Sequence, residues 1–340
     1  MTAADLPRLS VRLHGGIDPR RCLELAKAAD THGFDTVWFA ENPFNRGVLP
    51  AASACAVTTT RVRTGIGVLN PYNRHPTLIA MEIGALDELA HGRARLGIGS
   101  GIASATERMD LSSERPLAAL RDAVTIVRGM LKGEEVDYTG RAFSAHKVRL
   151  EYQARRPDMP LLMAARGEQA LALCGKIADG LMISNMCPPE FTRQAVDAVR
   201  KAAHEAGRPA PGHVVQYIPC AARPDRAEAY ALAKTTIAEM LPGFWSLAQR
   251  IPAARSALLR AGELVEADFA VAVDRLRAGE KPEHALDDRF VAAFAIAGTA
   301  DDCLAQSRAY RVAGATELAL TFVGAQPERD MEYLAAGFGG

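Results

Sequence analysis

The sequence lacks the patterns that mark metal centres, redox dithiols and disulfide frameworks. The chain has six cysteines, and these are Cys22, Cys55, Cys174, Cys187, Cys220 and Cys303. No two of them have the short spacing of a zinc knuckle or a CxxC redox motif. HExxH helices, a meaningful Ser-His-Asp order and carboxylate clusters with metal-ligand spacing are missing as well. We therefore expect reduced, mostly buried thiols and no metal site, and hydrolysis by these routes has little support.

Excess charge and long apolar runs are also missing. Lys plus Arg and Asp plus Glu both number 40, so no global field draws the chain to nucleic acid or to an anionic membrane. No apolar run approaches the roughly 18 residues needed to span a bilayer, and residues 1–8 have no signal-peptide pattern. We expect a cytoplasmic protein whose partner is a small molecule, with no nucleic-acid or membrane partner.

What the sequence does contain is a regular alternation of apolar strands and helices. The expected strands are residues 9–14, 35–41, 64–69, 94–99, 160–165, 179–184, 213–218 and 317–323. The expected helices include residues 19–32, 49–60, 77–90, 116–131, 189–206 and a last one capped by Asp301 that runs to 312. Mostly apolar strands separated by helices are typical of a parallel sheet covered by helices.

Eight such strands predict an α/β fold of the (β/α)8 TIM-barrel class with helical insertions. An open doubly wound sheet is the alternative. Such a fold typically has a glycine-rich phosphate-binding motif after its first strand, and residues 14–17 do not match that motif. Residues 102–114 are expected to be a loop. A separate short hairpin is expected around residues 137–141, after the helix at 116–131. We expect one domain over residues 1–340, with a helical segment at about 224–290 that covers the barrel and partly caps it.

Residues 64–76 combine a strand with an unusual polar loop. The strand contains Gly65 and Gly67, and glycine inside a strand usually marks a bulge or a close backbone approach. In a TIM barrel the site lies at the carboxyl ends of the strands, so the residues that follow each strand are the candidates. They are Glu41, Asn42, Asn70, Ser100, Gly101, Arg166, Gly167, Ser184, Asn185 and Gly324.

Several of the candidate residues have two interpretations. Arg166 and Gly167 stand at a helix start, which favours an anion such as a phosphate, but an ordinary turn has the same pattern. Glu41 is either a polar contact or proton-relay group, or a carboxylate bonded to a neighbouring arginine. A structural role in the loop is favoured over catalysis for His75. Cys187 is expected to be an inert loop cysteine, because no base can be named for it.

A barrel with few titratable groups and an apolar mouth suits an organic cofactor that carries its own chemistry. The most specific motifs are residues 67–76, 86–89 with 92–94, 97–101, 164–167, 177–180 and 294–299. Together, and in this order along nearly the whole chain, they resemble the luciferase-like flavin or deazaflavin oxidoreductases, in particular methylenetetrahydromethanopterin reductase.

The resemblance implies a TIM-like barrel that binds coenzyme F420 or FMN at the carboxyl ends of its strands. It also implies a bulge with a cis peptide between Gly67 and Val68, against which the cofactor ring lies. The cofactor-binding residues that it suggests are Gly67, Val68, Asn70, Ser100 and Gly101 around the ring, Arg166 and Gly167 near the phosphate, and Ser184. Glu41 is the catalytic candidate.

Two departures from the reductase pattern fall on the substrate side of the expected site. Where the reductase has an Asp-His pair after the second strand, this chain has Glu41 and Asn42. Where the reductase has an aspartate after the glycines of the fourth strand, this chain has Ile102. The resemblance therefore leaves fold and cofactor class unchanged but predicts a changed substrate.

Three functions are open from the sequence. The first is hydride transfer between bound F420, or reduced flavin, and an organic substrate, with the protein supplying orientation and a dry pocket. The second is an FMN-dependent luciferase-like monooxygenase. The third is a non-catalytic barrel with a binding or regulatory role, suggested by Ile102 in place of the aspartate. The family commonly forms homodimers or larger homo-oligomers, so we expect the same here.

Overall fold

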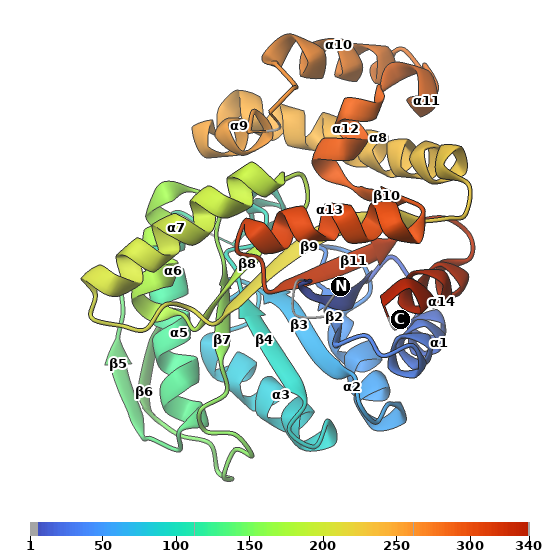
Figure 1. Ribbon diagram of the computed structural model, residues 1–340. Helices are drawn as coiled ribbons and strands as arrows, with labels where there is room; N and C mark the ends of the chain where they lie inside the picture. Colours follow the sequence, from blue (N-terminus) through green and yellow to red (C-terminus); the bar gives the residue numbers. More distant parts are fainter. Residues whose placement is uncertain (1–5, 112, 261, 339–340) are drawn as a thin grey trace.

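The core of the molecule is a closed barrel of parallel strands (Figure 1). The computed structural model describes residues 6–111, 113–260 and 262–338. The barrel strands are β1 Arg8–His14, β2 Thr36–Ala40, β3 Arg63–Leu69, β4 Ala94–Ile98, β7 Leu161–Ala164, β8 Gly180–Ile183, β9 His213–Ala222 and β11 Glu317–Phe322. They pair in the order β9-β11-β1-β2-β3-β4-β7-β8, and β8 pairs with β9 to close the ring. The predicted (β/α)8 barrel is confirmed, and the open sheet is wrong.

Helices cover the outside of the barrel between successive strands. They are α1 Pro19–Thr31, α2 Val48–Thr58, α3 Pro76–Leu89, α5 Pro116–Leu131, α6 Glu168–Ile177, α7 Pro189–Glu205, α13 Ala300–Val312 and α14 Pro327–Phe338. Several of these helices begin with proline. The backbone N–H at the first helical position has no acceptor within the helix, so its absence in proline costs no hydrogen bond. Asp18 caps α1 by accepting a hydrogen bond from the Arg20 amide at 2.9 Å.

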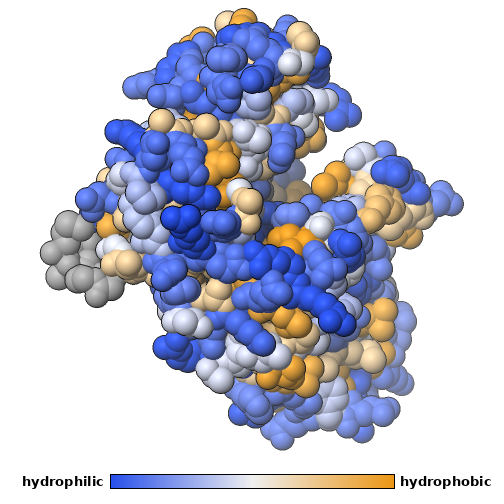
Figure 2. Space-filling model, turned by 90° about the vertical axis from the view of Figure 1, so that its right-hand side faces the viewer, coloured by the Kyte–Doolittle hydropathy of each residue, from blue (hydrophilic) through white to orange (hydrophobic). Residues whose placement is uncertain are grey.

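A helical cap lies over one side of the barrel, at the top of Figure 1. It consists of α8 Arg226–Arg250, α9 Pro252–Leu258, α10 Glu266–Arg277, α11 Pro282–Ala285 and α12 Asp288–Phe294. The cap has an apolar cluster of its own, in which Phe269 stacks on Trp245 at 5.6 Å and meets Phe290 and Phe294 edge-on. Figure 2 shows the molecule hollowed between the cap and the barrel body below it.

The structure corrects the sequence prediction at several element boundaries. The expected loop at 102–114 contains a short helix, α4 Ala103–Glu107. Thr299, and not Asp301, caps α13, because Thr299 and Asp302 form a reciprocal capping box. A three-residue strand, β10 Ile296–Gly298, pairs with the end of β9 and was not predicted. The expected hairpin is present as β5 Val136–Thr139 and β6 Ser144–Val148.

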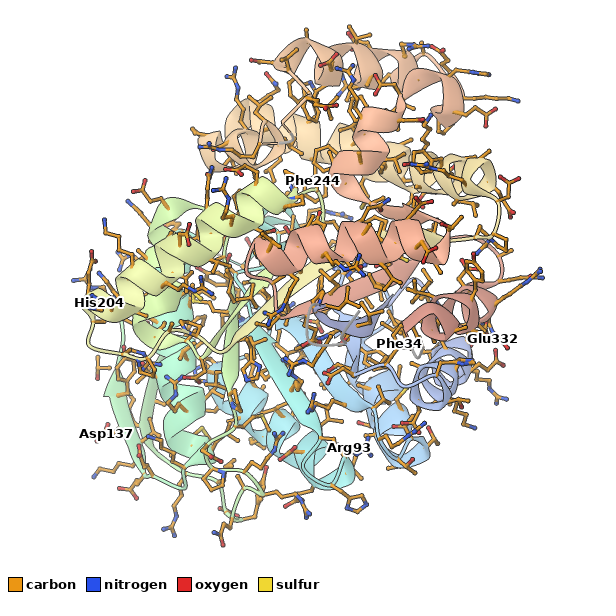
Figure 3. The ribbon with its side chains drawn as sticks, viewed as in Figure 1. Phe34, Arg93, Asp137, His204, Phe244 and Glu332 are labelled. Carbon is orange, nitrogen blue, oxygen red and sulfur yellow. The ribbon has the colours of Figure 1, made fainter. Side chains whose placement is uncertain are left out.

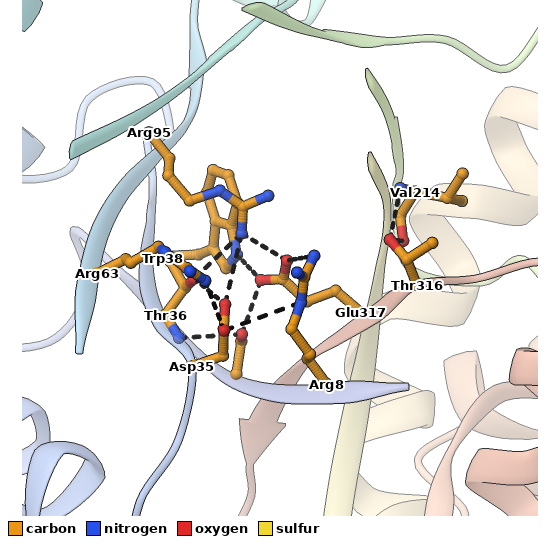
Figure 4. Close-up of polar contacts among 10 residues, drawn as sticks. Arg8, Asp35, Thr36, Trp38, Arg63, Arg95, Val214, Thr316 and Glu317 are labelled. Carbon is orange, nitrogen blue, oxygen red and sulfur yellow. Dashed lines mark hydrogen bonds and ion pairs between the residues drawn. The ribbon is translucent and has the colours of Figure 1, made fainter. Parts of the chain in front are cut away.

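The floor of the barrel, at the amino ends of the strands, is a buried polar network (Figure 4). The fully buried Glu317 accepts hydrogen bonds from Ser10 Oγ at 2.7 Å and from Trp38 Nε1 at 2.6 Å. Arg95 pairs with the same carboxylate and lies over the Trp38 ring at 4.7 Å. Buried charges are stable only when they are paired and hydrogen-bonded, and this network provides both.

Replacing Glu317 with glutamine should lower the free energy of unfolding by about 3 to 5 kcal/mol, because it removes the nearest counter-charge of the buried Arg95 cation and leaves only Asp35 at 3.8 Å. Urea unfolding followed by circular dichroism measures the change. Glu190→Gln, which removes an exposed carboxylate paired with Arg193, is the control and should leave the midpoint unchanged. Equal effects of the two variants would contradict the role given to the floor network.

Candidate active site

Large side chains fill the interior of the barrel toward its floor. Small side chains take the inward positions at the carboxyl ends of the strands. The buried interior cluster consists of Trp38, Ala40, Leu162, Met182, Val215, Tyr217 and Ala319, and Val68 and Ala164 pack against it. Toward the mouth the inward positions are taken by Ala40, Ala164 and Gly99. At these three positions the strands carry no bulky side chain.

Strand β3 breaks its regular pairing where it reaches the mouth. The peptide bond between Gly67 and Val68 is cis, as the family resemblance implied. The register of β3 against β4 shifts between Gly67 and Leu69, which is the geometry of a bulge. The hydroxyl of Tyr217, which comes from β9, donates a hydrogen bond to the Gly67 carbonyl oxygen at 2.9 Å. The bulge is thus held from the opposite side of the barrel.

The glycines of β4 make room for the side chain of Val68. A Cβ on Gly97 would lie 3.1 Å from Val68 Cγ1, and a Cβ on Gly99 would lie 2.6 Å from Val68 Cγ2. Gly101 has a φ of 69° and lies against the side chain of the buried Asn70. The glycine-rich run after β4 is therefore explained by packing against the bulge and the following loop, and not by a dinucleotide fingerprint.

Arg166, Gly167 and Ser184 lie together at the ends of β7 and β8, as predicted. Arg166 Nη2 donates hydrogen bonds to Ser184 Oγ and, at 3.0 Å, to the carbonyl oxygen of Asn185. Gly167 is the N-cap of α6 and provides no side-chain cap for the helix amides. The Arg166 guanidinium also lies 5.1 Å from the ring centre of Phe244, which belongs to the cap (Figure 3). The cap thus reaches the expected phosphate end of the site.

Glu41 is held in an ion pair and not left free. Its two carboxylate oxygens accept hydrogen bonds from Arg74 Nη1 at 3.1 and 3.2 Å, and Arg74 also pairs with Glu82 at 2.7 Å. This is the arginine-bound alternative that the sequence left open for Glu41. The side chain of His75 accepts a hydrogen bond from the Thr77 amide at 3.3 Å and caps α3, which is a structural role.

Cys187 is fully enclosed, and burial raises the pKa of its thiol, partly opposed by Arg166 and Ser184. A thiol of this kind is a poor nucleophile at neutral pH, in agreement with the inert role expected of it. The six cysteines are free and buried.

The substrate-side candidates lie on the rim of the mouth. Asn42 is partly exposed, and Ile102, just before α4, is 59% exposed. The cofactor-side candidate Ser100 is partly exposed as well. Phe44 is 57% exposed and lies under the guanidinium of Arg108 at 4.2 Å. Two exposed apolar side chains at one rim give it an apolar character.

Two residues of the site were missed by the sequence analysis. Arg12 on β1 and Tyr217 on β9 point into the barrel, where the Arg12 guanidinium lies 5.0 Å from the centre of the Tyr217 ring. Both stand inside strands and not after them, so a search of strand ends passes over them. The available signal was the alternation of β1, which places Ser10, Arg12 and His14 on one face.

Among the described residues no group of His, Cys, Asp and Glu side chains could hold a metal ion. The same part of the chain has no helix that is long and apolar enough to cross a membrane.

The fold defines a (β/α)8-barrel protein with helical insertions. The profile of the luciferase-like monooxygenases matches residues 2–317. The chain belongs to this family and is an oxidoreductase, so the non-catalytic interpretation is set aside.

The chain is similar to curated proteins and solved structures along most of its length. The 5,10-methylenetetrahydromethanopterin reductase of Methanolobus tindarius is 30% identical over 298 residues, which cover 86% of this chain and 87% of the relative. The structure of the coenzyme F420-dependent tetrahydromethanopterin reductase of Methanopyrus kandleri matches with a TM-score of 0.85 at 23% identity, covering 97% of each chain. The FMN-bound oxygenating component of 3,6-diketocamphane monooxygenase of Pseudomonas putida matches with a TM-score of 0.74 at 16% identity, again over 97% of each chain. The two structures support the fold alone.

Tyr217→Phe should lower the free energy of unfolding by about 1 to 3 kcal/mol, because it leaves the buried Gly67 carbonyl without its donor. Urea unfolding measures the effect. Tyr333→Phe is the matched control, since the partly buried Tyr333 hydroxyl makes no hydrogen bond within the described residues. An unchanged stability of Tyr217→Phe would show that this hydrogen bond does not support the bulge.

Proposed function

We propose that the chain transfers a hydride between coenzyme F420 bound in the barrel mouth and an organic substrate. The observation that carries the proposal is the bulge at Gly67 and Val68, held by Tyr217 and set against the glycines of β4. When bound, reduced F420 or reduced flavin would supply a hydride from its ring system, and the oxidised cofactor would accept one. The protein has to bind, orient and shield the reactants.

The residues of the mouth fit a planar cofactor. Val68 is partly exposed although its neighbours in β3 are buried, so one face of its side chain is open to the mouth. Its other contacts are to Gly97, Gly99 and the small Ala164, which leave a shallow cradle. A ring lying on Val68 would have Asn70, Ser100 and Gly101 at its edge, as the family resemblance suggests.

Arg166 and the start of α6 suit the cofactor phosphate. The guanidinium is fixed by Ser184 and Asn185, and the helix amides beside it have no side-chain cap from Gly167. Helix amides and a fixed arginine both favour an anion. Arg166 also contacts the ring of Phe244, which belongs to the helical cap. This contact brings the cap against the phosphate end of the site, where it reduces the access of water.

Glu41 has a positioning role in this proposal. Its ion pair with Arg74 ties the end of β2 to the loop after β3, which carries Asn70. A carboxylate that is paired in this way supports the loop and is poorly placed to move a proton. The site would then work through orientation, with the cofactor carrying the reaction.

The substrate proposed here is not the pterin of the similar reductases. By the family resemblance, Glu41, Asn42 and Ile102 replace an Asp-His pair and an aspartate, and here Ile102 and Phe44 are both exposed apolar side chains. We propose a smaller organic substrate that enters over this apolar rim.

An FMN-dependent monooxygenase is the second candidate, favoured by the family that the chain belongs to and by the FMN-bound relative in fold. Spectra and mass spectrometry of cofactor retained by, or titrated into, the purified chain separate the two candidates. Tight binding of F420 with no binding of FMN supports hydride transfer, and the reverse supports the monooxygenase. Binding of neither cofactor would overturn both.

We further propose that residues 1–340 form a single domain in which the segment at 224–290 closes over the mouth. Assembly into a homodimer or larger homo-oligomer stays a prediction, which light scattering of the purified chain tests.

Gly67→Ala should weaken cofactor binding at least about tenfold, because the added Cβ overlaps the Tyr217 hydroxyl and the Met182 methyl group. Gly99→Ala displaces Val68 from the other side and should act in the same direction. Titration of F420 and FMN measures the affinity, and circular dichroism monitors the fold. Gly212→Ala, at a glycine with open space around it, is the control. Unchanged affinity in both test variants would disprove the assignment of the bulge as the cofactor seat.

Arg166→Gln should weaken the binding of FMN about tenfold and leave the binding of riboflavin unchanged, because only FMN carries the phosphate. Fluorescence quenching of the two flavins measures both affinities with the same protein. Arg200→Gln on the outer helix α7 is the control, since this arginine is exposed and remote from the mouth. A parallel loss of FMN and riboflavin binding would place Arg166 elsewhere than at the phosphate.

A further inference from the structure

Arg12 is a cation inside the barrel that has no counter-charge among the described residues. Its side chain points inward from β1, between the floor network and the mouth, over the ring of Tyr217. Nη1 donates one hydrogen bond, to Thr321 Oγ1 at 3.2 Å. Nε is buried and has no hydrogen-bond partner in the part of the chain that the structure describes. Burial lowers the pKa of the guanidinium from its usual value.

The other inward-facing arginine, Arg95, also has one buried nitrogen without a hydrogen-bond partner, Nη2, but its charge is matched by carboxylates. It pairs with the Glu317 carboxylate, donates to Thr36 Oγ1 at 3.1 Å and stacks on Trp38. Arg12 has only a hydroxyl and an aromatic ring. Unpaired buried charges are costly to folding, so an arginine held without a carboxylate needs another explanation than stability.

Neither the floor carboxylate Glu317 nor the mouth carboxylate Glu41 balances Arg12. Glu317 is engaged by Arg95, and Glu41 at the end of β2 is engaged by Arg74. His14, the next inward residue on β1, adds no negative charge, and its pKa is lowered by burial and by Arg12 itself. The mouth therefore has a positive charge that is left for a ligand to match.

The Arg12 residue is not sealed off from solvent, because it is partly exposed. A cavity of about 270 Å³, which Arg12, His14 and Thr321 help to line, lies between strands β1 and β11 and the helices α1 and α14, since Leu25 and Met331 line it as well. This cavity is on the outer side of the barrel wall and is separate from the mouth.

We propose that Arg12 is a specificity-determining residue that binds an anionic group, a carboxylate or its equivalent, on the substrate. This inference deepens the proposed function by giving the substrate a charge. The substrate then combines an apolar part, which matches the rim at Phe44 and Ile102, with an anionic group that meets the guanidinium.

Isothermal titration of the full chain with benzoate and with its neutral analogue benzamide tests the proposal. The wild type should bind benzoate more tightly than benzamide. Arg12→Gln should weaken benzoate binding about 10- to 100-fold and leave benzamide unchanged, as expected for a hydrogen bond to a charged group. Arg12→Lys should restore part of the preference. Arg200→Gln, which removes an exposed arginine of the outer helix α7, is the control for the general field and should behave like the wild type.

Unfolding by urea separates a binding role from a structural one. Arg12→Gln removes an unmatched charge, so its midpoint should equal or exceed that of the wild type. A lower midpoint together with unchanged benzoate affinity would make Arg12 a structural residue and overturn the proposal. An equal loss of benzoate binding in Arg200→Gln would also overturn it, because the effect would then come from the overall field.

A last arm distinguishes the substrate from the cofactor as the source of the anion. Arg12→Gln should bind reduced F420 and reduced FMN as the wild type does. If the affinity for a reduced cofactor falls while benzoate binding is unchanged, Arg12 serves the cofactor ring and the substrate assignment is overturned. The benzoate titrations use the cofactor-free chain, so they remain interpretable if neither cofactor binds and the proposed function fails.

Discussion

The hydrogen bond from the Tyr217 hydroxyl to the Gly67 carbonyl connects the two halves of the barrel at the level where the site begins. Burial raises the pKa of this hydroxyl, so it remains a donor throughout the ordinary pH range. Beneath it, Glu317, Arg95 and Trp38 form a floor in which each charged group is matched. Above it, the Val68 side chain enters the space that the glycines of β4 leave open. This contact between β9 and β3, together with the glycines of β4, holds the bulge in place at the mouth.

The electrostatics of the interior change from the floor to the mouth. At the floor, carboxylates and guanidinium groups compensate each other and no ligand is needed. At the mouth, Arg12 is unmatched, and Arg166 stands beside helix amides that no side chain caps. Two separate positive positions suit two separate anionic groups, a cofactor phosphate under the cap and an acidic group on the substrate. The apolar rim between Phe44 and Ile102 complements the rest of the substrate.

The strands and most helices were predictable because their signals are local. Apolar runs predicted the barrel strands. The starts of α1 and α3 were predicted from Asp18 with Pro19 and from Pro76. The N-cap residue of α13 was predicted wrongly because Thr299 and Asp301 are both of residue types that favour the N-cap position. Only the reciprocal hydrogen bonds between Thr299 and Asp302 decide between them. The short β10 and α4 have too few residues to show a period. The ion pair of Glu41 with Arg74 and the isolation of Arg12 depend on which strands become neighbours, and no local pattern specifies that.

The central claim is that the bulge at Gly67 and Val68 is the seat of the cofactor ring. A crystal structure of the chain with F420, and a second one with FMN, tests it most directly. The account predicts the ring of the bound cofactor in contact with Val68, and its phosphate within hydrogen-bond distance of Arg166 or of the amides at the start of α6. A ring bound elsewhere, with the surface of Val68 left open to solvent, would contradict it.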